Sequence, residues 1–120
     1  MFEAEGNFII YDKQGPLGSI IKQSLKKTNI KVYRHKKISG IADAVKLKSE
    51  VKFLFILFVY NEEYELIDCV RLAKFDIPIV FAPIDKNSHD NLKRVKGIEV
   101  MDVSTSKIEY VSQIVDFLKL

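Results

Sequence analysis

Five short apolar runs recur along the chain, each rich in β-branched or aromatic side chains. Residues of these types favour an extended backbone, so each run predicts a β-strand. The runs are NFIIY (7–11), IKVYR (30–34), VKFLFILFV (51–59), IPIVFA (77–82) and IEVMDV (98–103). The 51–59 run is the most apolar of the five, and no acidic residue occurs from Val51 to Asn61.

The segments between these runs carry apolar residues at helical spacing, so each predicts a helix. Gly15 and Pro16 favour a helix start, which places the first helix at 17–28. Ser39 is expected to cap the second helix, and Gly97 to end a weakly marked fourth one. The stripe expected to face the core on the third helix consists of Leu66, Cys69, Val70 and Ala73. The last helix is predicted from about residue 106 to the C-terminus.

The strict alternation of strands and helices predicts right-handed crossovers and a parallel sheet with helices on both faces. A strand covered on both faces stays apolar throughout, so the 51–59 strand is expected at the sheet centre and the more polar 30–34 strand at an edge. The fold class is therefore α/β: a single (βα)5 doubly wound, flavodoxin-like sheet with strand order 2-1-3-4-5. Residues 1–6 are expected to form a leader and residues 7–120 the domain.

Composition and charge agree with one globular domain. The chain has 120 residues, 48% of them hydrophobic, which suffices for one core. Its net charge of +3 comes from 19 basic and 16 acidic residues, and the basic ones are scattered except for short clusters at 26–27, 34–37 and 93–96. This pattern is typical of a solvated surface rather than a nucleic-acid footprint. The single cysteine excludes an intrachain disulfide, and no apolar run reaches the roughly 20 residues of a membrane span. We therefore expect a cytoplasmic protein without membrane contact.

Several features together resemble the receiver domain of two-component response regulators. Asp12 closes the first strand, IPIVF forms the fourth strand, and a helix follows the fifth. The resemblance covers nearly the whole chain and implies phosphoryl transfer to an aspartate at the end of the third strand. It also implies acids at the end of the first strand that hold Mg²⁺, a hydroxyl residue ending the fourth and a lysine ending the fifth.

The sequence departs from that pattern at every one of these positions. Asp12 is followed by Lys13 instead of a second acid, residues 57–60 contain no aspartate, the fourth strand ends at Ala82 without a hydroxyl, and Lys107 comes late enough to begin the last helix. Asp12 is then a remnant of the acidic pocket that accepts hydrogen bonds from the following loop. The chain resembles a pseudo-receiver, which implies a non-catalytic, phosphorylation-independent module of signalling or transcriptional control. No catalytic, cofactor-binding or metal-binding residue is expected, and the protein is not expected to be an enzyme.

The loop DKQGPLGS, residues 12–19, leaves an alternative function open. It places glycines and a serine where a first strand meets a helix, the location at which flavodoxin-like folds hold a phosphate or a flavin. The loop matches neither G-x-G-x-x-G nor a P-loop, and Pro16 removes one amide donor. Binding of a small phosphate-bearing ligand is therefore the alternative to a protein-interaction module.

The last helix predicts a surface for a protein partner. Its expected core stripe is Ile108, Val111, Val115 and Leu118. Tyr110, Ile114 and Phe117 widen the apolar arc to about 180°, more than packing on a sheet requires. These three residues either cover the sheet edge or form an interaction face. In the second case we expect a protein partner, or a homodimer, at the face made by the fourth helix, fifth strand and fifth helix, with nucleic acid bound only through an attached domain.

The remaining reactive side chains are expected to be structural. His35 and His89 lie 54 residues apart in polar surroundings and are predicted to be surface residues. Cys69 falls on the inward stripe of the third helix, so an inert core thiol is expected.

Overall fold

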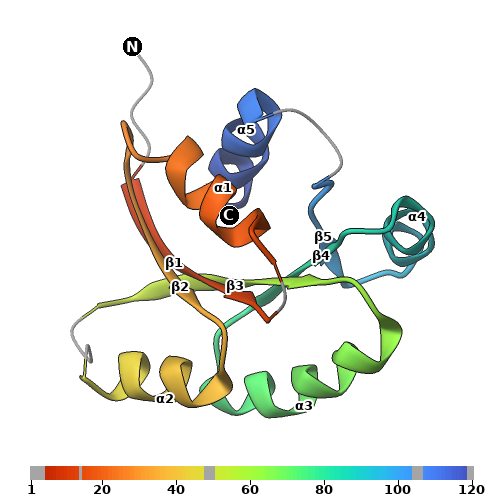
Figure 1. Ribbon diagram of the computed structural model, residues 1–120, viewed down its shortest axis with the longest axis horizontal. Helices are drawn as coiled ribbons and strands as arrows, with labels where there is room; N and C mark the ends of the chain where they lie inside the picture. The colour runs from red at the N-terminus through yellow and green to blue at the C-terminus, as the bar shows by residue number, and fades with distance from the viewer. Residues whose placement is uncertain (1–4, 14, 48–50, 104–106, 119–120) are drawn as a thin grey trace.

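The computed structural model describes residues 5–13, 15–47, 51–103 and 107–118 (Figure 1). The strands are β1 (Glu5–Asp12), β2 (Asn29–His35), β3 (Phe53–Tyr60), β4 (Ile79–Pro83) and β5 (Glu99–Val100). The helices are α1 (Leu17–Ser24), α2 (Ile38–Leu47), α3 (Asp68–Leu72), α4 (Lys86–Lys93) and α5 (Lys107–Leu118), with 3₁₀ turns η1 (Glu63–Ile67) and η2 (Ala73–Phe75) flanking α3. Within the described ranges, none of these helices combines the length and apolar content that crossing a membrane requires.

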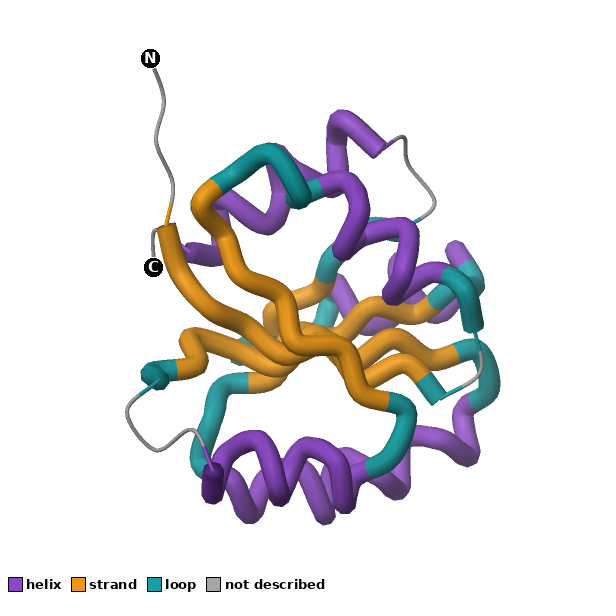
Figure 2. Tube along the Cα trace, turned by 60° about the vertical axis from the view of Figure 1, so that its left-hand side comes forward, coloured by secondary structure: helices purple, strands orange, loops and turns teal. Residues whose placement is uncertain are grey.

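The five strands form one parallel sheet in the order β2-β1-β3-β4-β5, which confirms the predicted order. α1 and α5 cover one face of the sheet and α2 and α3 cover the other, while α4 lies beside β4 and β5 (Figures 1 and 2). The doubly wound α/β class is therefore confirmed. Because the strands are parallel, their carboxyl ends all meet at one edge of the sheet.

β3 occupies the centre of the sheet, as its apolar sequence predicts. Every residue of β3 except the half-buried Leu54 is buried, whereas β2 at the edge is mostly half-buried or exposed. From Phe55 onward, the side chains of β3 alternate between two cores. Those on the α1–α5 side are Phe55, Leu57 and Val59, and those on the α2–α3 side are Ile56, Phe58 and Tyr60.

The third helical segment departs from its predicted stripe. Leu66 and Cys69 are half-buried against the α2–α3 core, but Val70 is 70% exposed and Ala73 is also exposed. The 3₁₀ turns η1 and η2 advance by about 120° per residue instead of about 100°, which rotates the buried face. The inward positions are taken by Glu65, Asp68 and Leu72. The prediction that Val70 and Ala73 face the core is therefore wrong.

Several element boundaries differ from the predictions: α1 ends at Ser24 instead of residue 28, α4 ends at Lys93 instead of at Gly97, and β5 covers only Glu99–Val100. β1 begins at Glu5, so residues 5 and 6 belong to the strand rather than to a leader, and residues 1–4 lie outside the described residues. α2 begins at Ile38, one residue before the expected cap Ser39. α4 begins after Asp85, whose carboxylate accepts a hydrogen bond from Ser88 N at 3.1 Å. Aspartate is a preferred N-cap residue, a signal that the weak apolar periodicity of this segment concealed.

The two histidines are less exposed than predicted. His89 on α4 is only 8% exposed, with Nδ1 3.2 Å from Asp90 Oδ1. α4 packs against β4 and β5 and has few large apolar residues, so His89 fills an inward position, and its prediction as a surface residue is wrong. His35 is half-buried, and this burial lowers the pKa of its imidazole.

Candidate functional site

Three neighbouring strands end in register at the carboxyl edge of the sheet. Asp12 of β1 pairs with Val59 of β3, and Val59 pairs with Ala82 of β4. Cross-strand partners point to the same face, so this row presents one carboxylate, one valine and one alanine. The three residues are 2%, 1% and 0% exposed. Where the receiver resemblance implies a nucleophilic aspartate and a hydroxyl, the row has apolar side chains.

The Asp12 carboxylate is held by the loop that follows it. Its Oδ1 accepts a hydrogen bond from Gly15 N at 3.0 Å, and its Oδ2 accepts one from Gly18 N at 2.7 Å. A Cβ at position 18 would lie 2.9 Å from Oδ2, so this approach requires glycine. The charge also lies at the N-terminus of α1, where the helix dipole favours it. The prediction that Asp12 accepts hydrogen bonds from the loop is confirmed.

These hydrogen bonds bear on the alternative of a phosphate or flavin site in residues 12–19. A phosphate at the N-terminus of α1 would need backbone amides, and Asp12 already accepts from those of Gly15 and Gly18. Pro16 has no amide to donate. A buried carboxylate at this position would also repel a phosphate. The geometry therefore argues against that alternative.

The same edge does not fit the Mg²⁺ that the receiver resemblance implies. Mg²⁺ requires a near-octahedral set of oxygen ligands. Asp12 already accepts hydrogen bonds from two amides, Val59 and Ala82 offer no side-chain oxygen, and Lys13 stands where a second acid would be needed. Across the described part of the chain, no three His, Cys, Asp or Glu side chains gather in a way that could hold a metal ion.

Lys13, which stands in place of a second acid, reaches towards α3. Its Nζ lies 3.8 Å from Asp68 Oδ2, and the same oxygen accepts a hydrogen bond from Tyr11 Oη at 2.8 Å. Burial, followed by the hydrogen bond and the charge of Asp68, raises the pKa of Tyr11 far above its ordinary value, so Tyr11 remains a neutral donor. This network balances a buried acid and joins β1 to α3.

Arg34 of β2 closes the 12–19 loop from the other side. Its Nη2 donates a hydrogen bond to Gly15 O at 3.0 Å. Its Nε is buried next to Gly18 and has no hydrogen-bond partner among the described residues. The basic cluster at 34–37 is therefore not only a solvated face, because its first member is part of the fold.

Glu65 holds the connection that follows β3. Its Oε2 accepts hydrogen bonds from Asn61 N at 2.9 Å and from Glu62 N at 2.8 Å, and the residue is 2% exposed. Like Asp68, Glu65 accepts hydrogen bonds from donors within the chain. The two buried acids after β3 therefore support the fold rather than phosphoryl chemistry.

Cys69 lies on the inward side of α3 as a free, half-buried thiol. Burial, followed by the charge of Asp68, raises the pKa of this thiol to about 11. Since the thiolate is the reactive form, the geometry supports the expectation of an inert cysteine.

The predicted interaction face on α5 is largely buried within the chain. Ile114 is 0% exposed and Tyr110 is 6% exposed, and Tyr110 Oη donates a hydrogen bond to Val103 O at 2.6 Å. Phe117 is half-buried, with its ring 5.9 Å from that of Phe55. α5 packs on the sheet and also on α1, so it needs a wide apolar arc to cover both neighbours. Of the two alternatives left open for this row, burial against the sheet holds for Tyr110 and Ile114.

The predicted core stripe of α5 is correct only in part. Val115 is buried, and Val111 and Leu118 are half-buried against the α1–α5 core. The side chain of Ile108 lies outside the described residues. Lys107 begins α5, as predicted, and is too late in the chain to end β5.

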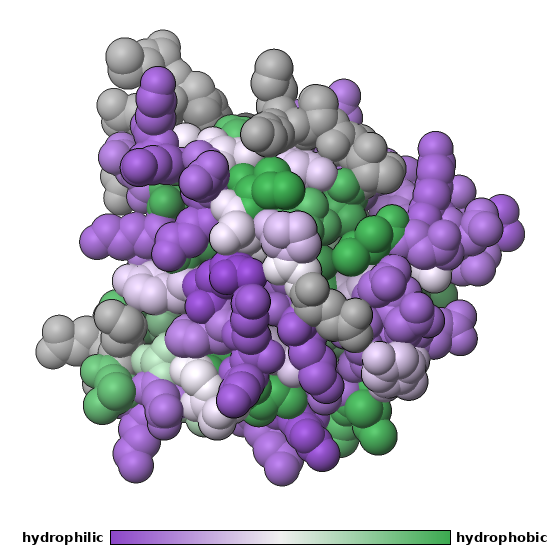
Figure 3. Space-filling view, in the orientation of Figure 1, coloured by the Kyte–Doolittle hydropathy of each residue, from purple (hydrophilic) through white to green (hydrophobic). Residues whose placement is uncertain are grey.

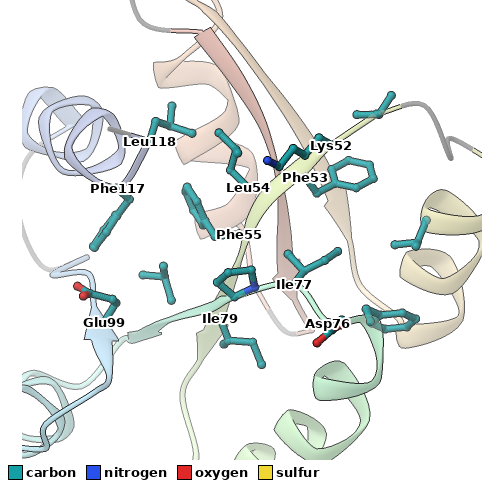
Figure 4. Close-up of a pocket in the computed structure, with 15 residues that line it drawn as sticks. Lys52, Phe53, Leu54, Phe55, Asp76, Ile77, Ile79, Glu99, Phe117 and Leu118 are labelled. Atoms are coloured by element: carbon teal, nitrogen blue, oxygen red, sulfur yellow. The ribbon is translucent and has the colours of Figure 1, made fainter. Parts of the chain in front are cut away.

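An apolar pocket of about 610 Å³ lies at the opposite, amino edge of the sheet (Figure 4). Phe55, Phe117 and Leu118 lie on the α5 side of it, and Phe53 on the other side (Figure 4). Charged groups of both signs lie at its rim: Lys52, Asp76 and Glu99. None of the described residues that line it is a serine, threonine, cysteine or histidine, so the pocket supplies no hydroxyl or thiol nucleophile for catalysis.

A surface that the sequence analysis missed lies on η1 and α3. Tyr64, Ile67 and Val70 are 66%, 68% and 70% exposed. Apolar side chains are visible among polar ones at the lower edge of the molecule, where α2 and α3 lie (Figure 3). Tyr64, Ile67 and Val70 are three residues apart in the sequence. In a 3₁₀ turn, residues at this spacing lie on the same side, so the sequence predicts this outward row once the segment is treated as a 3₁₀ turn.

Comparison with known proteins agrees with the fold. No protein-family model and no curated protein matches the sequence. Among solved structures, the chain is similar to a response regulator receiver protein from Burkholderia phymatum, with a TM-score of 0.73, 12% identity and 97% of each chain covered. It is also similar to a signal receiver domain described as that of a Luxo repressor protein from Vibrio parahaemolyticus, with a TM-score of 0.63, 11% identity, and 97% of this chain and 92% of the other covered.

A bacteriophytochrome response regulator gives a further match, with a TM-score of 0.59, 10% identity, and 97% of this chain and 94% of the other covered. At such identities the likeness shows a receiver-type, flavodoxin-like fold and nothing of the chemistry. The function must therefore be argued from the residues at the carboxyl edge.

Proposed function

We propose that this chain is a receiver-like signalling module that acts without phosphoryl transfer, through contact with a partner protein. The observation that carries the proposal is the row of Asp12, Val59 and Ala82, in which the one carboxylate is hydrogen-bonded to the loop and its neighbours are apolar. The receiver domains that share the fold support the signalling context. The proposal assigns no catalytic, metal-binding or cofactor-binding residue to the chain, which is then not an enzyme.

The proposal includes a setting and a mode of assembly. We place the module in the cytoplasm, in signalling or transcriptional control, where any contact with nucleic acid comes from an attached domain. A homodimer through α4, β5 and α5 would need exposed side chains, because Tyr110 and Ile114 are buried. Val95, which follows α4 and is 47% exposed, is such a residue.

The test is to offer the protein the small-molecule reagents that load receivers. The chain is incubated with Mg²⁺ and acetyl phosphate, or with Mg²⁺ and beryllofluoride, beside a phosphorylatable receiver as a positive control. We expect no covalent phosphoryl group by intact-protein mass spectrometry. We also expect no saturable change in the amide NMR signals of Asp12, Val59 and Ala82.

Asp12→Asn serves as the matched control, because it removes the only acid of the row. A stoichiometric, saturable adduct at the carboxyl edge that disappears in Asp12→Asn would overturn the proposal. The absence of any reagent-induced change in the spectrum of either the wild type or Asp12→Asn supports it.

A further inference from the structure

The outward row on η1 and α3 is a consequence of how the segment is anchored. Glu65 and Asp68 point inward, where they accept hydrogen bonds from backbone amides and from Tyr11 Oη, respectively. Positions three residues apart nearly eclipse one another in a 3₁₀ turn and are neighbours on an α-helix. The exposed residues Tyr64, Ile67 and Val70 therefore follow one another along one side of the segment.

An acidic groove begins where this row begins. It has a volume of about 530 Å³ and is lined by Asn61, Glu62, Glu63, Tyr64, Asp85 and Ser88. Three of these are carboxylates, and no lysine or arginine is among the described lining residues. The chain as a whole carries a net charge of +3, so the sign of this groove is opposite to that of the protein.

The two walls of the groove are fixed to each other. Ile84 N donates a hydrogen bond to Tyr60 O at 2.9 Å, which joins the end of β3 to the start of the β4–α4 connection. The carboxylate of Asp85 accepts a hydrogen bond from Ser88 N, which fixes its position. The preceding residue, Ile84, is 41% exposed. A partner therefore meets a preformed surface that has negative charge in the groove and apolar side chains beside it.

We propose that this surface binds a positively charged, amphipathic segment of a partner protein. The groove carboxylates pair with lysine or arginine. Ile67 and Val70 accept apolar side chains spaced by three or four residues, as a helix presents them. The inference rests on the proposed function as a protein-interaction module and names the chemistry of its partner.

The probe is a synthetic helical peptide of about 15 residues with lysines on one face and leucines on the other. Two matched peptides accompany it: one in which glutamates replace the lysines, and one in which serines replace the leucines. Binding to the full chain is measured by fluorescence anisotropy, and the site is mapped by amide NMR. We expect saturable binding of the lysine–leucine peptide, with signal changes concentrated at residues 61–71 and 84–88 and an affinity that falls as salt rises.

Four exposed positions supply the variants. Glu63→Lys in the groove and Ile67→Ser in the row should each weaken binding by about tenfold or more. The controls Glu99→Lys on β5 and Leu47→Ser on α2 make the same chemical changes elsewhere and should stay within about twofold of wild type. All four should keep the far-ultraviolet circular dichroism of the parent, since the substituted side chains are exposed.

Equal binding of the glutamate–leucine peptide, signal changes centred elsewhere, or control variants that weaken binding as much as Glu63→Lys would overturn the inference. Self-association of the chain that is lost in Ile67→Ser would also overturn it, because the surface would then belong to a second copy. These outcomes are independent of the acetyl phosphate test, so failure of the peptide leaves the proposed function standing on its own evidence.

Discussion

Two rows of large apolar side chains, similar in spacing, occupy opposite environments in this protein. One row, on α5, consists of Tyr110, Ile114 and Phe117, and the other, on η1 and α3, consists of Tyr64, Ile67 and Val70. The first is buried or half-buried in the core between α1, α5 and the sheet. The second is about two-thirds exposed. Spacing and hydrophobicity alone therefore do not decide which row is core.

The neighbours of each segment decide instead. α5 contacts both the sheet and α1, so its apolar arc must cover two surfaces. The η1–α3 segment contacts the sheet with a narrow inward side that Glu65, Asp68 and Leu72 already fill. An apolar row remains exposed when the inward positions of its segment are occupied by other residues.

The largest expected difference between the rows is in stability. Ile114→Ala removes a fully buried side chain and should lower the free energy of unfolding by about 2–5 kcal/mol. Ile67→Ala removes an exposed one and should change it by no more than about 0.5 kcal/mol. Urea titration of both variants measures the difference. If Ile67→Ala is as destabilising as Ile114→Ala, the row on η1 and α3 is core and the comparison is wrong.

The next largest effect is the difference in alkylation rate between a thiol on the buried side of α3 and one on its exposed side. Burial raises the pKa of Cys69 from 9.0 to about 11, so its thiolate fraction near neutral pH should be about 100-fold lower than that of an unperturbed thiol. Val70→Cys in a Cys69→Ser background places a thiol on the exposed side instead. Iodoacetamide should alkylate native Cys69 about 100-fold more slowly than Cys69 in the unfolded chain.

The pH profile checks the origin of this protection. The alkylation rate of Cys69 should rise until about pH 11, whereas that of the Val70→Cys variant should level off near pH 9.0, the ordinary pKa of a cysteine thiol. Equal rates and equal profiles at the two positions would mean that α3 has no distinct inward side.

A smaller loss is expected when the anchor of the exposed row is removed. Glu65→Ala leaves the amides of Asn61 and Glu62 without their acceptor and should lower the free energy of unfolding by about 2 kcal/mol. Hydrogen exchange at these two amides should accelerate more than exchange in β1. Glu63→Ala, an exposed neighbour, is the control. If both variants behave alike, Glu65 does not set the orientation of the row.

The smallest effect concerns a single hydroxyl on the buried row. Tyr110→Phe keeps the ring but removes the hydrogen bond to Val103 O, and we expect a loss of about 1 kcal/mol in the free energy of unfolding. Urea titration beside the wild type measures it. A variant as stable as the parent would show that Val103 O finds another donor, and that the ring alone anchors this end of α5.

Much of the architecture can be read from the sequence because it depends on apolar runs. The all-apolar β3 could only be central, and alternation with helical segments left few topologies for five parallel strands. The sequence also shows directly that β3 ends without an acidic residue. Asp12 at the end of β1, followed by glycines, predicts its own hydrogen bonds to the loop.

The remaining features depend on how each helix is rotated about its axis and on which elements pack against it. A single sequence shows neither of these well. The burial of Tyr110 and Ile114 follows from the contact between α5 and α1, which no local pattern encodes. The exposure of Val70 follows from a change of helical pitch within a few residues. The burial of His89 follows from α4 having little else to turn inward.

The register of Asp12, Val59 and Ala82 also limits how this protein can change over evolutionary time. An aspartate at position 59 would place a second carboxylate beside a buried one whose hydrogen bonds are already in use, and like charges at such sites resist ionisation together. A phosphate acceptor would further need Lys13 replaced by an acid and a hydroxyl at position 82. None of these changes alone would complete a phosphoryl-transfer site. The row therefore opposes the gain of a phosphate acceptor by a single substitution.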